Sequence, residues 1–84
     1  MKLLIIEPDL NFALLLEKAI EVNFKNLDVT FEKDPDRIPT ILEEKAVDLA
    51  IIECALPKIS VFDIVTLFED RNIPVILMAD DPSP

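Results

Sequence analysis

The sequence predicts an α/β domain whose core is a small parallel sheet. Three short apolar runs, at residues 3–6, 49–52 and 75–79, are separated by segments with helical periodicity. Continuous apolar runs of this length are typical of strands buried on both faces, as in parallel sheets. Each run is followed directly by a carboxylate: Glu7, Glu53 or Asp80. Because open parallel sheets keep their sites at the carboxyl ends of the strands, the sequence predicts an acidic pocket there.

The first helix is predicted over residues 10–23, directly after the first strand. Asp9 is a favourable N-cap residue for this helix. On a helical wheel, six residues share the predicted inner face: Phe12, Ala13, Leu15, Leu16, Ala19 and Ile20. Leu14 falls on the opposite face. A single exposed leucine is common in soluble proteins, and we consider Leu14 both in that way and as an interface candidate.

The middle of the chain predicts an edge strand followed by a short helix. Residues 27–32 alternate between apolar and polar, which is typical of a strand with one covered face. Asp34 and Pro35 then predict a cap and a first helical turn. Pro39 is unfavourable in a helix interior, so we expect the second helix to be short or broken and best formed over residues 39–45.

The last third of the chain predicts a central strand over residues 48–53 and a third helix over residues 61–70. Ser60 is predicted to form a capping box with Asp63 at the start of that helix. The inner face of the helix is predicted to contain Val61, Ile64, Val65 and Phe68. The last apolar run then forms the fourth strand.

Length and charge restrict the class of protein. We assign residues 1–84 to one domain, because a chain of this length has no room for a second. The formal net charge is −9, from 17 acidic and 8 basic residues. Without a basic stripe, direct binding to nucleic acid or to an anionic membrane is not expected. No signal peptide and no apolar stretch approaching the roughly 20 residues of a membrane span are present, so we expect a cytoplasmic protein.

Two residue types are missing, and each absence excludes a class of chemistry. The chain has no histidine, which excludes nucleophilic catalysis by Ser-His or Cys-His pairs and imidazole metal sites. It has no glycine, which excludes the glycine-rich loops that cradle nucleotides. Cys54 is the only cysteine, so no internal disulfide can form. Its neighbours are acidic and no histidine can activate it, so we expect an inert thiol.

Three segments together resemble a known family. Residues 48–57 read Asp-Leu-Ala-Ile-Ile-Glu-Cys-Ala-Leu-Pro. They resemble the central strand and following loop of response-regulator receiver domains, where the phosphoaccepting aspartate follows Asp-Leu and three apolar residues. Residues 4–9 resemble the first strand and acidic pair of that family, and residues 73–79 resemble its fourth strand. The resemblance implies a flavodoxin-like (CheY-like) parallel sheet of strand order 2-1-3-4 with three helices, truncated after the fourth strand.

The chain departs from the family at the positions that make the phosphorylation switch. Glu53 stands where the resemblance places the phosphoaccepting aspartate. Glu7 matches the first member of the metal-binding acidic pair, but Pro8 stands at the second position, and Asp9 is expected to cap a helix instead. Met78 stands where the family has a threonine or serine, and a thioether cannot donate a hydrogen bond. The lysine of the family's fifth strand has no counterpart in these 84 residues. We therefore expect a degenerate, non-phosphorylatable receiver.

Several other functions remain open at this point. Glu7 and Glu53 are a possible Mg²⁺ pair, although we expect solvated carboxylates left from an ancestral site and no cofactor. Glu53 is alternatively a permanent mimic of a phosphorylated residue, or the acceptor of an atypical receiver that still responds to Mg²⁺ and phosphorylation. A metal-dependent phosphohydrolase ranks last, because no lysine or arginine lies in the strand-end motifs. We expect no enzymatic activity.

The last strand predicts an interaction surface. Without a fifth strand it would be an apolar sheet edge, and unprotected edges of this kind pair with other chains. The predicted interface comprises Val75, Ile76, Leu77, Met78 and Leu14, together with the third helix. We expect the partner to be a second copy or the effector domain of the same protein, in bacterial signal transduction or transcription regulation. Either the chain ends at Pro84 or it is the N-terminal regulatory part of a longer transcription activator.

Overall fold

The computed structural model describes residues 1–54 and 60–79. Four strands alternate with helices along the chain, as the sequence predicts. The elements are β1 (Lys2–Ile6), α1 (Leu10–Asn23), β2 (Asp28–Glu32), a 3₁₀ turn (Pro35–Arg37), α2 (Ile38–Glu44), β3 (Leu49–Glu53), α3 (Val61–Glu69) and β4 (Val75–Met78). The predicted strand and helix positions are confirmed to within one or two residues.

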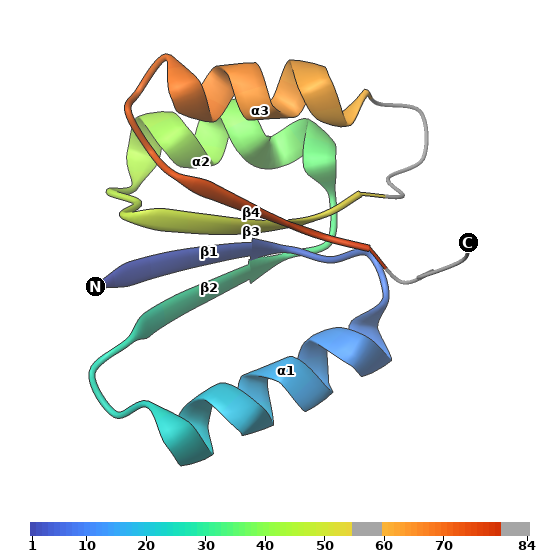
Figure 1. Cartoon of the computed structure of the whole chain (residues 1–84), viewed down its shortest axis with the longest axis vertical. Helices are drawn as coiled ribbons and strands as arrows, with labels where there is room; N and C mark the ends of the chain where they lie inside the picture. Colours follow the sequence, from blue (N-terminus) through green and yellow to red (C-terminus); the bar gives the residue numbers. More distant parts are fainter. Residues whose placement is uncertain (55–59, 80–84) are drawn as a thin grey trace.

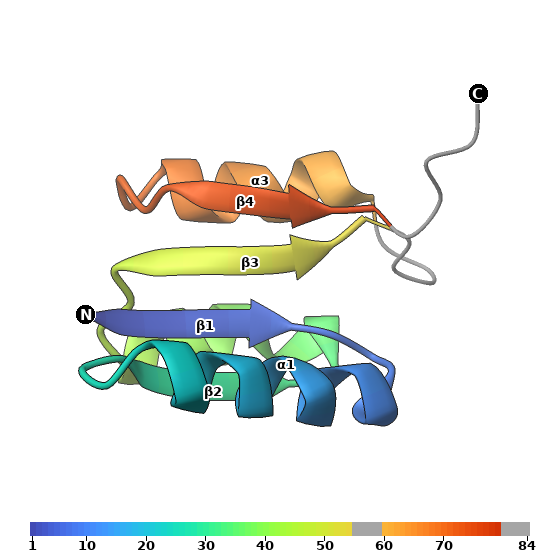
Figure 2. The same cartoon turned by 60° about the horizontal axis from the view of Figure 1, so that its bottom comes forward.

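All strand pairs are parallel, and the strand order is β2-β1-β3-β4. This confirms the predicted four-stranded order, with β2 and β4 at the two edges of the described sheet. Figure 1 shows α2 and α3 together on one face of the sheet and α1 alone on the other. Figure 2 shows that α1 lies beside β1 and β2, whereas no helix lies in front of β3 and β4 on that side.

The main core lies between the sheet and the α2–α3 layer. Its strand residues alternate with those that face α1, because side chains on a strand point to opposite faces in turn. The buried members of this core are Leu4, Ile6, Ile38, Ile41, Leu42, Ala50, Ile52, Ile64 and Phe68. Phe68 of α3 is fully buried and is the largest of them. The predicted inner face of the third helix is thereby confirmed for Ile64 and Phe68, which are buried, and for Val61, which packs half-buried against the core.

Helix α1 begins at the predicted cap. The Asp9 carboxylate accepts hydrogen bonds from the backbone N–H groups of Asn11 (3.0 Å) and Phe12 (3.4 Å). The predicted inner face is wrong in part, because Leu15 and Ala19 are exposed and only Ala13 of the helix is buried. The wheel identified one broad apolar face, but the sheet beneath α1 covers only part of it.

The second helix is short, as predicted, but Pro39 does not break it. Pro39 occupies the first turn of α2, where its missing N–H has no intrahelical partner to lose. The preceding 3₁₀ turn is capped by the Asp34 carboxylate, which accepts from the Asp36 N–H at 2.9 Å. Ile38 therefore enters the core at the very start of α2, one residue earlier than predicted.

The predicted capping box at Ser60 is wrong. Ser60 is the N-cap residue of α3, but its side chain makes no capping hydrogen bond. Instead its backbone carbonyl accepts from the N–H groups of both Asp63 (3.1 Å) and Ile64 (3.3 Å). The Asp63 N–H, which the serine hydroxyl would have satisfied, is thus taken by the backbone in a tight first turn.

The chain leaves α3 through a turn that directs it into β4. Asn72 adopts a left-handed conformation with φ 58°, which asparagine tolerates better than most residues. The N–H groups of Arg71 and Ile73 both donate to the Phe68 carbonyl at 3.0 Å. The end of α3 and the start of β4 are therefore tied to the same core residue.

Candidate functional site

Glu7 and Glu53 lie at the carboxyl ends of two neighbouring strands. β1 and β3 are paired up to Ile6 and Ile52, so the two glutamates follow directly after a registered pair. Both residues are buried, with exposed fractions of 5% and 3%. The expectation of solvated carboxylates is therefore wrong. By strand alternation Glu53 shares its side of the sheet with Ile51, on the face of α1, so the fold directs this carboxylate inward.

Glu7 connects three segments at this end of the sheet. Its backbone N–H donates to the Glu32 carbonyl at 3.0 Å, which extends the pairing of β1 with β2. Its carboxylate oxygen Oε2 accepts from the Asp9 N–H at 3.2 Å and so closes the turn around Pro8. Pro8 itself is exposed. The Glu7 carboxylate therefore stabilises the turn that connects β1 to α1.

Asp9 is placed for capping, as predicted from its position before the helix. Its Oδ1 atom accepts two N–H groups of the first turn of α1, so its carboxylate faces the helix N-terminus. Among residues 1–54 and 60–79, no group of three carboxylate, cysteine or histidine side chains is close enough to hold a metal ion. Among the described residues, Glu7 and Glu53 are thus the acidic side chains at these two strand ends, and they do not belong to a larger group of metal ligands.

Met78 is the residue of β4 that lies in register with Glu53. The N–H of Cys54 donates to the Met78 carbonyl at 2.8 Å, so the two strand ends are held together. Met78 and Cys54 are both half-buried, and the Cys54 thiol is not in a disulfide. The loop with Pro57 and the carboxylate of Asp80 lie outside the described residues. A thioether therefore stands beside the strand end that carries Glu53.

The predicted interface residues of β4 divide between the two faces of the sheet. Val75 is half-buried and packs against the main core, so it contributes little free surface. Ile76 and Leu77 are 51% and 46% exposed. Leu14 is 52% exposed on the outer side of α1, as the helical wheel predicts. The exposed apolar candidates are thus Ile76, Leu77 and Leu14.

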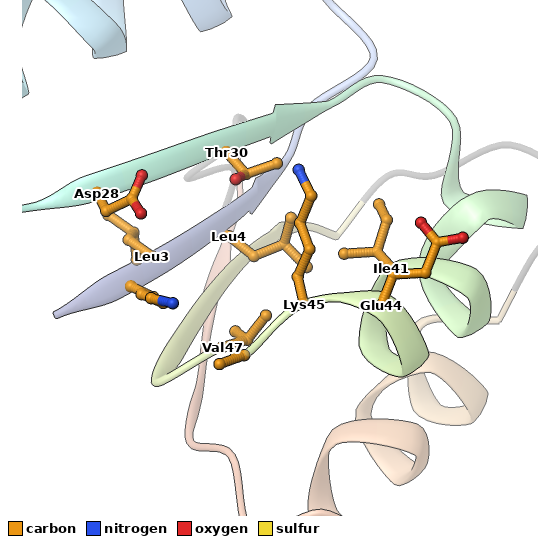
Figure 3. Close-up of a pocket in the computed structure, with 10 residues that line it drawn as sticks. Leu3, Leu4, Asp28, Thr30, Ile41, Glu44, Lys45 and Val47 are labelled. Atoms are coloured by element: carbon orange, nitrogen blue, oxygen red, sulfur yellow. The ribbon is translucent and has the colours of Figure 1, made fainter.

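A cavity of about 280 Å³ lies at the other end of the sheet, between β2 and α2 (Figure 3). The Lys45 side chain extends across it toward Thr30 of β2, above a floor that includes Leu4 and Ile41. Asp28 and Glu44 add carboxylates to the lining. These residues come from separate elements and share no motif, so no sequence pattern points to them.

None of the helices in the described part of the chain is long and apolar enough to cross a lipid bilayer.

The fold matches that of known signalling domains. The receiver domain of the Francisella response regulator 1452 superimposes with a TM-score of 0.78 and 21% identity, over 98% of this chain and 68% of that chain. The MaeR response regulator bound to beryllium trifluoride gives a TM-score of 0.80 and 15% identity, over 99% of this chain and 70% of that chain. The BeF₃-activated conformation of SdrG from Pseudomonas melonis Fr1 gives 0.74 and 22%, over 99% and 73%. No protein-family model and no curated protein sequence matches this chain.

Proposed function

We propose that this chain, which has the fold of response-regulator receiver domains, is a non-phosphorylatable receiver-like domain of bacterial signal transduction. In this role it acts in the cytoplasm as a protein-interaction module and transmits no phosphorylation signal of its own. The observation that carries the proposal is the pairing of Glu53 with Met78 at the adjacent ends of β3 and β4. The fold is thus that of a receiver, whereas the two strand ends have side chains unsuited to a phosphoryl switch.

Each of these two side chains argues against the switch on chemical grounds. Glu53 has a carboxylate, but the extra methylene moves it away from the position that an aspartate would occupy. It is also only 3% exposed, which restricts the approach of a phosphodonor. Met78 cannot donate a hydrogen bond to a phosphoryl oxygen as a threonine or serine hydroxyl would. Residue 53 is therefore a poor phosphoryl acceptor, and residue 78 lacks the hydroxyl that would bind the phosphoryl group.

The connection between β1 and α1 supports the same conclusion. Pro8 is exposed and carries no ligand atom in its side chain, and Asp9 accepts backbone N–H groups of α1. Mg²⁺ is normally bound through carboxylates together with waters and substrate phosphates. The acidic group nearest to Glu7 along the chain is thus engaged at the helix cap, so we propose a domain that functions without a cofactor.

Interaction is the remaining role for such a domain. Ile76 and Leu77 expose about half of their surface on an edge strand, and edge strands present unpaired backbone groups to other chains. Burying two side chains of this size contributes roughly 1.5–3 kcal/mol each when burial is complete. The expected partner is a second copy or the effector domain of the same protein.

Beryllofluoride provides the direct test. MaeR and SdrG have structures with this phosphoryl analogue, whereas we expect no change in the amide NMR spectrum of this chain with beryllofluoride and millimolar Mg²⁺. The matched variant is Glu53→Asp combined with Met78→Thr, which restores an aspartate and a hydroxyl at the two paired positions. Shifts in the unmodified chain that cluster around Glu53 and Met78 would contradict the proposal.

One alternative retains the switch. Glu7 and Glu53 are both buried at neighbouring strand ends, and such a pair suits a divalent cation better than two exposed carboxylates would. In that case the chain is an atypical receiver that binds Mg²⁺ and responds to phosphorylation. Mg²⁺ alone would then shift the resonances of both glutamates, and the Glu7→Gln variant would abolish the response.

A further inference from the structure

A polar row of β2 lies on the side of the sheet that faces α2. Leu4 and Ile6 of β1 belong to the main core, and their registered partners in β2 are Thr30 and Glu32. Asp28 lies in the same row, because every second side chain of a strand points to the same face. On this side, β2 thus presents polar side chains beside a strand whose own side chains are part of the core.

Helix α2 is too short to cover the whole row. It has seven residues and is therefore roughly 10 Å long, whereas the five residues of β2 extend over roughly 16 Å. The helix ends at its C-cap residue Lys45, and the chain then continues into β3. The cavity of about 280 Å³ shown in Figure 3 remains between the first half of β2 and the end of α2.

The charged side chains of this cavity balance one another but form no ion pairs. Two are positive and two are negative, in a chain whose net charge is −9: Lys2, Lys45, Asp28 and Glu44. Within residues 1–54 and 60–79, the ion pair that forms joins Arg37 to Glu32 at 3.6 Å, outside this lining. Lys2 and Asp28 do not pair although they are registered neighbours. All four charged groups are therefore available to a ligand.

Backbone hydrogen bonds fix the rim of the cavity. The Lys2 N–H donates to Oδ2 of Asp48 at 2.8 Å, and the Lys2 carbonyl accepts from the Asp48 N–H at 2.8 Å. The Asp28 N–H donates to the Met1 carbonyl at 2.9 Å. The lining side chains are thus attached to a backbone that is already ordered, which lowers the entropic cost of binding a ligand.

We propose that this cavity binds a small zwitterion with an aliphatic side chain, of which an α-amino acid is the simplest example. The Lys45 ammonium, which extends toward Thr30 in Figure 3, and the Thr30 hydroxyl donate hydrogen bonds to the ligand carboxylate. Asp28, two residues earlier on β2, accepts from the ligand ammonium. The ligand side chain packs on the apolar floor with Leu4 and Ile41.

Charge and size determine this class of ligand. Asp28 and Glu44 repel a simple anion such as phosphate, and the two lysines repel a simple cation, whereas a zwitterion forms charge-assisted hydrogen bonds at both ends. Residues two apart on a strand are roughly 6.6 Å apart, a spacing that suits a ligand whose two charged groups are joined by one carbon atom. The cavity volume is near the lower end of the roughly 300–1,000 Å³ of ligand pockets, so the ligand is small.

The site is separate from the one that carries the proposed function. Its lining belongs to residues 2–47 and lies where β1 and β2 begin, whereas Glu53 and Met78 lie where β3 and β4 end. Because neighbouring strands are parallel, these are opposite ends of the sheet. The inference therefore goes beyond the interaction role and gives the domain a ligand that is unrelated to phosphoryl transfer.

Ligand analogues test the proposal on the unmodified 84-residue chain. Leucine is titrated into isotope-labelled protein, and we expect saturable amide NMR shifts that cluster at Thr30, Lys45 and Val47, with a dissociation constant at or below about 1 mM. 4-Methylpentanoate lacks the ammonium and leucinamide lacks the carboxylate. Each is expected to bind about tenfold more weakly or worse, because a charged group of the cavity then has no partner.

Two lysines provide a matched pair of variants. Lys45→Met removes the ammonium but keeps an unbranched side chain, and it should weaken leucine binding about tenfold or more. Lys33→Met changes an exposed lysine just after β2 that does not line the cavity, so it should leave binding unchanged. Thr30→Val removes the hydroxyl at nearly the same volume and should also weaken binding. Circular dichroism verifies that the three variants keep their fold.

Each contrary result has a defined meaning. Binding of 4-methylpentanoate or inorganic phosphate as tight as that of leucine would indicate an anion site, and equal binding of leucinamide would indicate a cation site; either would overturn the proposal. Shifts that do not saturate, or equal weakening by Lys45→Met and Lys33→Met, would overturn it as well. A response to beryllofluoride would overturn the proposed function and leave this site standing, because it concerns the other end of the sheet.

Discussion

Glu53 and Met78 are registered partners at the ends of β3 and β4, and the N–H of the residue after Glu53 donates to the Met78 carbonyl at 2.8 Å. A buried carboxylate and a half-buried thioether thus occupy adjacent positions on the side of the sheet that α1 covers only in part. This pair distinguishes the chain from a domain that registers a phosphoryl group with an aspartate and a hydroxyl.

The first prediction concerns covalent phosphorylation. With acetyl phosphate and Mg²⁺, we expect the intact mass of the protein to stay unchanged. The Glu53 carboxylate lies one methylene further from the backbone than that of an aspartate, and the residue is buried. A receiver domain with an aspartate at this position is the positive control and should gain one phosphoryl group under the same conditions. A phosphoryl adduct located at Glu53 by peptide mass spectrometry would refute the prediction.

The second prediction concerns the cap of α1. Asp9→Ala removes the acceptor of the Asn11 and Phe12 N–H groups, so the free energy of unfolding should fall by about 1 kcal/mol in urea titrations. Asp9→Asn keeps an acceptor oxygen at the same position and should cost clearly less. Equal losses for the two variants would show that charge, and not the hydrogen bonds, stabilises the first turn.

The third prediction concerns the turn between β1 and α1. Glu7→Ala removes the oxygen that accepts the Asp9 N–H at 3.2 Å and leaves a space at a position that is 5% exposed. We expect a loss of roughly 1 kcal/mol or more, since the partly buried Asp9 N–H then lacks its acceptor. Glu7→Gln retains the oxygen and has nearly the same volume, so it should lose less. Amide exchange at Asp9, measured by NMR, should accelerate in the alanine variant alone.

The fourth prediction compares two phenylalanines of α3. Phe68 is fully buried, whereas Phe62 is 79% exposed. Phe68→Ala should destabilise the domain by about 3–5 kcal/mol, because it opens a cavity in the main core. The matched change Phe62→Ala should stay within about 0.5 kcal/mol, as is usual for surface positions. The free energies of unfolding are measured in urea. Similar losses for both variants would contradict the position of Phe68 in the main core and of Phe62 on the surface.

Strand positions and the Asp9 cap were predictable from the sequence because they depend on local patterns. A run such as residues 49–52 is apolar without interruption, which is typical of a strand in a parallel sheet. Asp9 acts within its own turn, so its role follows from its position next to the helix start. The burial of Glu7 was not predictable in this way. It depends on segments that are distant in the sequence, such as the end of β2, where the Glu32 carbonyl accepts from the Glu7 N–H.

Two predictions failed for reasons of tertiary structure, and one feature of the fold was not predicted. The hydroxyl of Ser60 is not used, because the backbone satisfies the N–H of Asp63 first. Leu15 and Ala19 remain exposed, because α1 lies over β1 and β2 and not over the centre of the sheet. The cavity beside Lys45 has no sequence signature, because β2 and α2 contribute to it from separate segments.

The sequence by itself determined the order and kind of the elements, the residue types at the strand ends and the excess of negative charge, since these follow from periodicity and composition. Only the tertiary structure decided that both glutamates are buried, that Met78 lies opposite Glu53 and that α1 lies over β1 and β2. Such features depend on which strands become neighbours and how far a helix reaches across them. Helical and strand periodicity describes one element at a time, so it carries no information about how separate elements pack against one another.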